Sequence, residues 1–171
     1  MGTTVDAVSE RPLEQARHLA NRERKRPKQA SLRRAVSTAY YALFHLLSLE
    51  TAKNWKRPAE RFTVARMLDH TPMVKVCAAK RDELNAHFKT GPTPGHDLEV
   101  LKHLHAITNT FVNMLQHRHT ADYDGAAKWS RTDVLEKVES VEAAFQSWRE
   151  IKNEHEAQNF LVTLLLKERK N

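Results

Sequence analysis

Apolar residues recur at intervals of three and four along most of the chain, which is the spacing of one face of an α-helix. The longest such segment starts at Lys28 and contains no glycine or proline before Pro58. Its apolar positions widen until little polar face remains: Leu32, Val36, Ala39, Tyr40, Tyr41, Leu43, Phe44, Leu46 and Leu47. This pattern predicts a central buried helix. His45 lies within it, and we interpret it as a hydrogen-bonded core histidine.

A shorter amphipathic segment precedes the central helix. Ser9 can cap it, Pro12 falls in its predicted first turn, and its pattern fades at about Arg24. Pro27 then disfavours helical geometry in the residue before it. The sequence therefore predicts a helix of about four turns followed by a basic linker.

The middle of the chain predicts two shorter helices that meet at a corner. Pro58 can start the first, and Thr71 can cap a second that opens at Pro72. The segment 85–96 holds two glycines and two prolines, so we expect a loop there.

Two further amphipathic helices follow that loop. The first begins at Asp97 and repeats Val100, Leu104, Ile107, Phe111 and Met114 on one face. The second begins at Ser130 or Thr132 and places Val134, Val138, Val141, Phe145 and Trp148 together. The last segment carries Phe160, Leu161, Leu164 and Leu165, either as a continuation or as a separate helix.

These elements predict an all-α protein, an up-down bundle of four to five main helices with a C-terminal helical extension. We expect one domain over residues 1–171: a basic N-terminal helix and linker over 1–27, a core bundle over 28–153, and a C-terminal helix over 154–171. A chain of 171 residues is long enough to bury a sizeable core. It has only 4 glycines and 6 prolines, which agrees with long helices.

The composition excludes several classes of protein. The single cysteine, Cys77, has no partner in the chain for a disulfide, and its apolar neighbours favour a buried thiol. No apolar run approaches the roughly 20 residues of a membrane span, and the N-terminus lacks the pattern of a signal peptide. We therefore expect a cytoplasmic protein with no membrane partner.

Positive charge is concentrated near the N-terminus. The formal net charge is +7, and residues 1–34 hold nine cationic and four acidic side chains. Such a cluster is typical of a surface that binds a polyanion, most often nucleic acid. The candidate RNA-binding residues are Arg24, Lys25, Arg26, Arg33, Arg34 and, at the end of a polar stripe on the helix from Asp97, His117. A solvated face that only keeps the protein soluble is the alternative.

The densest group of ionisable residues is the segment 116–125, QHRHTADYDG, which closes the helix from Asp97. Residues four apart share a helix face, so Arg118 is predicted to lie over Asp122 and His119 over Tyr123. One interpretation is a structural ion pair at a helix end. The other is a site in which an arginine, an imidazole and a phenol act on a phosphate.

Other chemistries have little support in the sequence. The ten histidines do not show the spacing of a zinc site, and the glycines are too scattered for a phosphate-binding loop. We therefore expect no cofactor and no metal. Arginine and histidine suffice for RNA cleavage, because the 2′-hydroxyl of RNA is itself the nucleophile and needs a base, a cation at the phosphate and an acid.

The segment LRRAVSTAYYALFHLL at 32–47, followed by RHTADYDG at 118–125, resembles the HEPN superfamily of small helical proteins. The resemblance spans about residues 13–150. It implies a dimeric bundle of four to five helices. Many members are metal-independent endoribonucleases of toxin–antitoxin, CRISPR-linked and phage-defence systems, and others bind RNA or nucleotides without cleaving them.

The resemblance also implies a site at Arg118, since catalytic members carry an arginine followed after four to six residues by a histidine. This chain has Tyr123 where that histidine would stand, and His119 in the intervening polar position. The candidate catalytic residues are therefore Arg118, His119 and Tyr123. Arg81 and His87 fit the same spacing but lie on an earlier segment.

Two functions follow as expectations. The first is a homodimeric HEPN-like RNA-binding protein, a metal-independent endoribonuclease of a toxin–antitoxin or phage-defence system. The second is a catalytically inactive dimeric scaffold, in which Arg118 and Asp122 are a structural lock and the partner is an antitoxin or a nucleotidyltransferase-like protein.

Overall fold

The computed structural model describes residues 5–91 and 94–165, and all regular secondary structure in these ranges is helical. The elements are α1 (Val5–Ala20), α2 (Gln29–Lys53), the 3-10 turn η1 (Pro58–Glu60), α3 (Arg61–Arg66), α4 (His70–Thr90), α5 (Leu98–Tyr123), α6 (Arg131–Ile151) and α7 (His155–Leu165). The predicted all-α class is confirmed.

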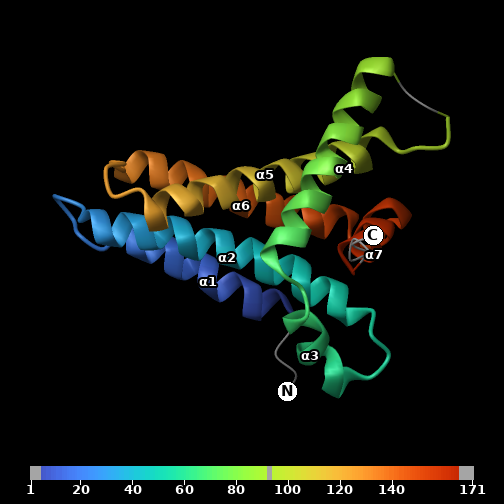
Figure 1. Ribbon diagram of the computed structural model, residues 1–171, viewed down its shortest axis with the longest axis horizontal. Helices are drawn as coiled ribbons and strands as arrows, with labels where there is room; N and C mark the ends of the chain where they lie inside the picture. The colour runs from blue at the N-terminus through green and yellow to red at the C-terminus, as the bar shows by residue number, and fades with distance from the viewer. Residues whose placement is uncertain (1–4, 92–93, 166–171) are drawn as a thin grey trace, which may run out of the picture.

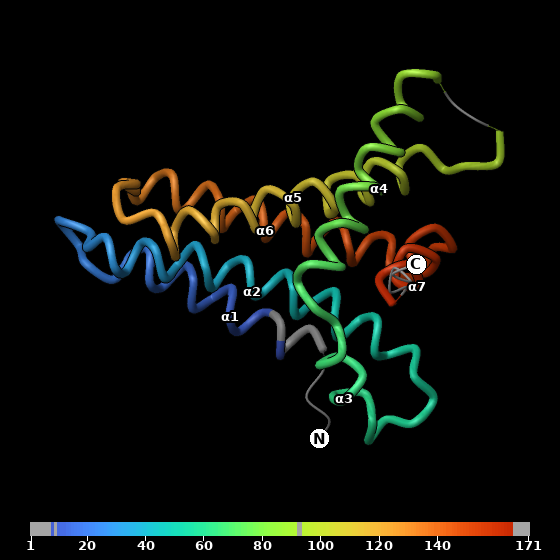
Figure 2. Tube along the Cα trace, viewed as in Figure 1, coloured from blue at the N-terminus to red at the C-terminus, as the bar shows by residue number. Residues whose placement is uncertain are grey.

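Helices α1, α2, α5 and α6 run side by side and form the body of the molecule (Figure 1). Helix α2 lies at the centre and packs against α1, α5 and α6. Helix α4 crosses the body steeply and rests on α5, and α7 packs at the end where α4 crosses (Figure 2). The loops that follow α1 and α5 both lie at the opposite end.

The core is continuous through the bundle and its centre is α2, as the sequence predicts. Leu32, Val36, Tyr40, Leu43 and Leu47 are fully buried there. Ile107 and Phe111 of α5, Val138 and Trp148 of α6, and Cys77 of α4 complete it with almost no exposed surface. Burial of each large apolar side chain contributes about 1.5–3 kcal/mol.

One core assignment is wrong. His45 is exposed, although it stands in the most apolar segment of the chain. The helix period explains the error: Tyr41 and His45 lie one turn apart on the side of α2 that its neighbours leave uncovered, and Tyr41 is only half-buried.

The ends of α1 and α4 differ from the predicted ones. Helix α1 begins at Val5, so Pro12 lies inside it instead of in its first turn, and it ends at Ala20. Helix α4 starts at His70, two residues before Pro72. It continues to Thr90, through the first half of the predicted loop, because nothing breaks it before Gly91, whose φ of +88° suits glycine.

The starts of α5 and α6 agree with the sequence. Asp97 caps α5, its side chain accepting a hydrogen bond from the backbone nitrogen of Glu99 at 2.9 Å. Ser130 caps α6 within a capping box completed by Asp133. Helix α7 is separate from α6. The predicted extension of this helix to residue 171 lies partly outside the described residues.

Removal of the Ser130 hydroxyl is expected to destabilise the protein, because the backbone N–H of Asp133, in the first turn of α6, would lose its acceptor. We expect Ser130→Ala to lower the free energy of unfolding by about 1 kcal/mol. Urea denaturation would measure it. Ser140→Ala, on the exposed face of the same helix, is the matched control and should change stability much less.

Within the described ranges, every helix is too short or too polar to cross a lipid bilayer.

Candidate phosphate-binding site

Arg118 sits one and a half turns before the end of α5 and is held from two directions. Its Nε donates a hydrogen bond to Oδ2 of Asp122 at 3.0 Å. Its guanidinium carbon lies 5.3 Å from the ring centre of Tyr41 and 5.9 Å from that of Tyr40, both within cation–π range. The predicted pairing of Arg118 with Asp122 is confirmed, and the two tyrosines of α2 add a second support.

Asp122 is itself fixed by α2. The hydroxyl of Ser37 donates a hydrogen bond to its other carboxylate oxygen. The carboxylate therefore joins the two helices and orients the arginine, and the Arg118 side chain is only 16% exposed.

The outer part of the guanidinium has no such partner. Within the described part of the chain, the two terminal nitrogens of Arg118 donate no hydrogen bond. These two nitrogens are also accessible to solvent. Among the described residues, the polar side-chain atoms that are fully buried without a partner are the indole nitrogens of Trp129 and Trp148, and no atom of Arg118 is among them. A rigid guanidinium with two open N–H₂ groups is well suited to bind a phosphate.

A histidine that the sequence did not single out lies beside this arginine. The Nδ1 atom of His70, the first residue of α4, is 2.6 Å from the hydroxyl oxygen of Tyr40. Burial raises the pKa of Tyr40, so the phenol keeps its proton. Which of these two atoms donates depends on the tautomer of the imidazole. In the tautomer that accepts the phenol proton at Nδ1, the imidazole proton resides on Nε2.

The charge state of His70 follows from its surroundings. Burial lowers its pKa below the usual 6.5, and the nearby positive charge of Arg118 lowers it further, with smaller contributions in the same direction from His45 and His119. Asp69 opposes these effects but does not reverse them. His70 is therefore a neutral hydrogen-bond donor at pH 7.

This lowered pKa makes stability depend on pH. In the unfolded state His70 binds a proton at about pH 6.5, whereas in the folded state it binds one only at a lower pH. The contribution of neutral His70 to stability is therefore fully present above pH 6.5, and it is lost as the pH falls below that value. We expect the melting temperature to fall between pH 7.5 and pH 5, and to fall less in His70→Gln, which keeps a polar partner for Tyr40. An equal fall in the wild-type protein and in His70→Gln would contradict this. His155→Gln, on α7, is the matched control and should behave as the wild type does.

His119 and Tyr123 lie on the next face of α5. Both are exposed, Tyr123 to 76%, and their ring centres are 6.1 Å apart, which confirms their predicted proximity. Tyr123 contacts His119 and not the Arg118–Asp122 pair. The three candidate catalytic residues thus share the end of α5, with His119 close enough to affect His70 electrostatically.

Arg33 has a structural role that its sequence context did not indicate. From α2 its guanidinium donates to four backbone carbonyls at the end of α5 and in the loop after it: Ala121 at 2.9 Å, Asp124 at 2.7 Å, Gly125 at 3.2 Å and Ala127 at 2.6 Å. The bond to Ala121 satisfies a carbonyl that the helix end leaves without an intrahelical partner, and the other three bonds hold the loop against α2. Its donors are therefore already occupied within the protein.

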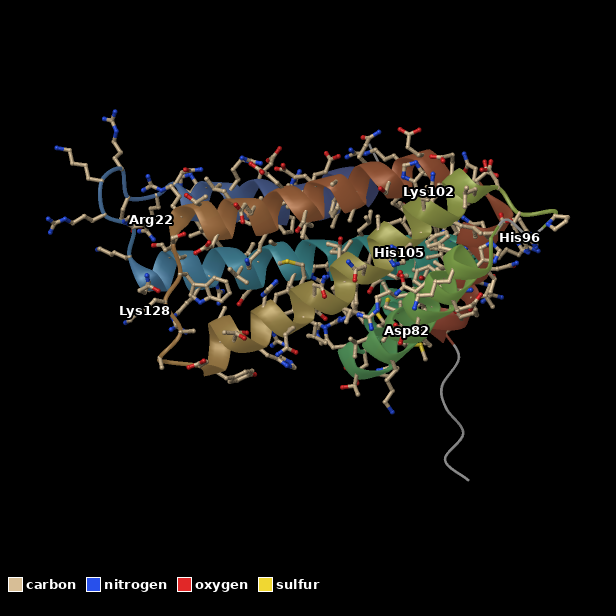
Figure 3. The ribbon with its side chains drawn as sticks, turned by 90° about the horizontal axis from the view of Figure 1, so that it is seen from above. Arg22, Asp82, His96, Lys102, His105 and Lys128 are labelled. Carbon is tan, nitrogen blue, oxygen red and sulfur yellow. The ribbon has the colours of Figure 1, made fainter. Side chains whose placement is uncertain are left out.

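The other basic candidates are exposed. Arg24, Lys25 and Arg26 lie in the loop between α1 and α2, and Arg34 lies on the surface of α2. Figure 3 shows Arg22 of the same loop and Lys128 at one end of the bundle. The loop is held in place, since Glu23 accepts hydrogen bonds from the Ser31 hydroxyl at 2.8 Å and from the backbone nitrogen of Lys28 at 3.2 Å.

Arg131 holds this loop from α6. It donates to the backbone carbonyls of Ala20 and Arg24, each at 3.2 Å, and to that of Glu23. We call the exposed cations around this loop the basic tip; they are Arg22, Arg24, Lys25, Arg26, Lys28 and Lys128.

The remaining candidates lie apart from Arg118. His117 is half-buried, and its ring centre is 6.3 Å from that of Trp129. Its pKa is lowered mainly by burial and to a smaller extent by the positive charge of Lys137. On α4, Arg81 donates to the neighbouring Asp82 at 3.0 Å, and His87 packs near Phe88.

No group of three or more histidine, cysteine, aspartate or glutamate side chains gathers closely enough to hold a metal ion among the residues at 5–91 and 94–165.

Sequence reasoning missed Ser37, Tyr41, His45 and His70 as parts of this site. The only available signal was the place of Tyr41 and His45 one turn apart, which the strong apolar pattern concealed.

Comparisons of the chain with protein-family models, with curated proteins and with solved structures gave no match.

Proposed function

We propose that this protein is a HEPN-like protein that binds RNA and cleaves it without a metal ion. The observation that carries the proposal is the state of Arg118: it is fixed over Tyr41 by Asp122, its terminal nitrogens are open, and a neutral His70 lies beside it. A cation held rigidly beside hydrogen-bond donors can stabilise the extra charge on a phosphate undergoing attack.

Each side chain has a role in this mechanism. Arg118 and the Nε2–H of His70 bind the non-bridging oxygens of the scissile phosphate. His119 accepts the proton of the 2′-hydroxyl as the 2′-oxygen bonds to phosphorus. The bond from phosphorus to the 5′-oxygen breaks, and the Tyr123 hydroxyl donates its proton to that oxygen. The His119 imidazolium then returns a proton to Tyr123, leaving a 2′,3′-cyclic phosphate and a 5′-hydroxyl.

The basic tip and Arg34 supply the rest of the RNA-binding surface in this proposal. They contact phosphates along the strand, which gives affinity without sequence preference and makes binding depend on salt. Arg33 is left out of this surface, because its donors already bind backbone carbonyls.

Incubation of the purified protein with RNA in excess EDTA tests the proposal. We expect cleavage products that end in a cyclic phosphate, and binding that weakens as salt is raised. Neither cleavage nor salt-sensitive binding by the wild-type protein would overturn the proposed function. A homodimer, a cytoplasmic location and a role in a toxin–antitoxin or phage-defence system are parts of the same proposal.

A second candidate function is favoured by the hydrogen bonds that link Arg118 to Asp122 and Asp122 to Ser37. These bonds join α5 to α2 and would serve equally in an inactive dimeric scaffold that binds an antitoxin or a nucleotidyltransferase-like partner. The effect of an Arg118 substitution on stability distinguishes the two, as described below.

A further inference from the structure

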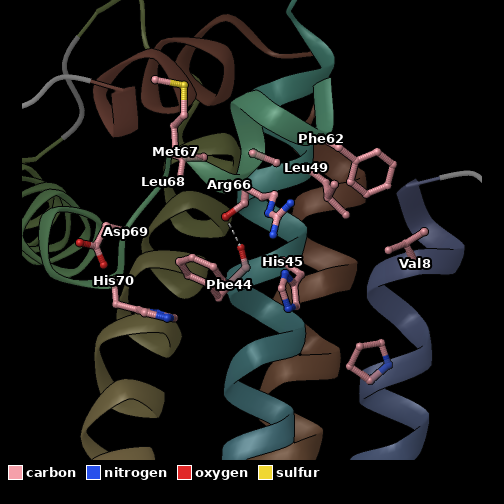
Figure 4. A pocket seen from close by; sticks show the side chains of 13 residues that line it. Val8, Phe44, His45, Leu49, Phe62, Arg66, Met67, Leu68, Asp69 and His70 are labelled. Carbon is pink, nitrogen blue, oxygen red and sulfur yellow. Dashed lines mark hydrogen bonds between the residues drawn. The ribbon is translucent and has the colours of Figure 1, made fainter. Parts of the chain in front are cut away.

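A cavity of about 750 Å³ opens beside the arginine site, between α1, α2 and the corner of α3 and α4. Its walls include Phe44, His45, Leu49, Phe62, Arg66 and His70, seen from close by in Figure 4. The volume lies within the range of small-molecule pockets, and the mixture of aromatic, apolar and a few polar groups is typical of them.

The cavity and the arginine site share a wall of rings. His70 lines the cavity, and its ring centre is 4.1 Å from that of Phe44. Its Nδ1 atom is hydrogen-bonded to the hydroxyl of Tyr40, whose ring lies under Arg118. His45 lines the cavity and stacks on Tyr41 at 6.3 Å, and Tyr41 lies under the same guanidinium. A ligand in the cavity is therefore one aromatic ring away from Arg118.

A second cation borders the cavity. Arg66, the last residue of α3, is exposed and extends toward His45 in Figure 4. Its side chain makes no hydrogen bond or ion pair with any residue that the structure describes. The cavity thus lies between two guanidinium groups with open donors, Arg66 on its rim and Arg118 behind the rings.

This arrangement matches the chemistry of a single nucleotide within a strand. A nucleobase is flat and aromatic, and each of the four bases can stack on histidine and phenylalanine rings. The phosphates on either side of it are anions that arginine binds well. A purely apolar ligand would leave both cations without a partner.

We propose that the cavity binds one unstacked base of single-stranded RNA, with its two flanking phosphates on Arg118 and Arg66. The inference rests on the proposed function and adds to it a base-binding subsite. Double-stranded RNA does not fit, since its bases are paired and stacked and its backbone alone is offered to the protein.

The test compares a short single-stranded RNA with the same RNA carrying one abasic nucleotide, scanned along the strand. Binding is measured by fluorescence anisotropy, for the wild-type protein and for His45→Ala and Arg66→Gln. The 2′-hydroxyls of the RNA are methylated, so that the proposed cleavage cannot occur during the measurement. We expect the abasic change at one position to weaken wild-type binding about tenfold. In His45→Ala the same change should have a clearly smaller effect, because one of the rings on which the base stacks is already missing.

The Arg66→Gln variant examines the rim separately. It should weaken binding of the intact and the abasic RNA by equal factors and lower the dependence of binding on salt, since it removes a phosphate contact. Arg57→Gln, at an exposed position of the same corner that does not line the cavity, and His155→Ala, on α7, are the matched controls and should bind as the wild type does.

The outcomes separate the two proposals. If the wild-type protein binds RNA through Arg118 but no abasic position matters, or if His45→Ala keeps the full tenfold effect, the base-binding subsite is wrong and the proposed function stands. If the wild-type protein binds no RNA, both fail. Circular dichroism of each variant checks that a loss of binding is not a loss of fold.

Discussion

Replacing Arg118 by glutamine is expected to lower the rate of RNA cleavage by about 100- to 1,000-fold, the usual cost of removing one charged or hydrogen-bonding group from a site that stabilises a developing anion. Glutamine keeps the arginine side chain as far as the position of Nε, but it is neutral and lacks the fork of two N–H₂ groups. Cleavage of a labelled RNA under single-turnover conditions in EDTA measures the effect. Arg149→Gln, at the surface of α6, should cleave as the wild type does.

The same variant distinguishes the RNA site from the structural lock. A site residue is often held at some expense to the fold, so Arg118→Gln should leave the free energy of unfolding nearly unchanged or slightly raised. If Arg118 is a lock, its loss leaves the half-exposed Asp122 carboxylate bound only to Ser37 and destabilises the fold. A clear loss of stability with unchanged RNA binding would favour the scaffold.

Replacing Arg33 by alanine is expected to lower the free energy of unfolding by about 3 kcal/mol. The substitution removes charged hydrogen bonds to four backbone carbonyls, at the end of α5 and in the loop after it. Urea denaturation, with folding followed by circular dichroism, measures the change.

The next residue supplies a sharp control for this experiment. Arg34 has the same chemistry and lies on the same helix, but it is exposed, and it donates no hydrogen bond to any residue in the described part of the chain. Arg34→Ala should change stability by no more than about 0.5 kcal/mol. Equal losses in the two variants would show that the carbonyl contacts of Arg33 contribute nothing.

The helices themselves were predictable because their apolar periods are long and regular. The cores of α2, α5 and α6 follow directly from the spacing of residues such as Val36, Phe111 and Val138. The helix ends were less predictable: whether 85–90 is helix or loop depends on one glycine, Gly91, and not on the average composition around it.

The site was predictable only where it is local. Arg118 and Asp122 are four residues apart on one helix, so their pairing follows from the helix period. His70 reaches Tyr40 only because α4 crosses the bundle, and a crossing angle leaves no trace in the spacing of a sequence. The role of Arg33 depends in the same way on a loop about ninety residues further along the chain.

The burial of one side of α2 affects how a similarity to this chain should be judged. In the AYYALFH segment, Ala39, Tyr40, Ala42 and Leu43 have no exposed surface, so a protein that repeats these four residues shares the need to fill the same interior. Tyr41 and His45 alternate with them on the open side of the helix. Agreement at these two positions would therefore say more about shared activity than agreement across the rest of the segment.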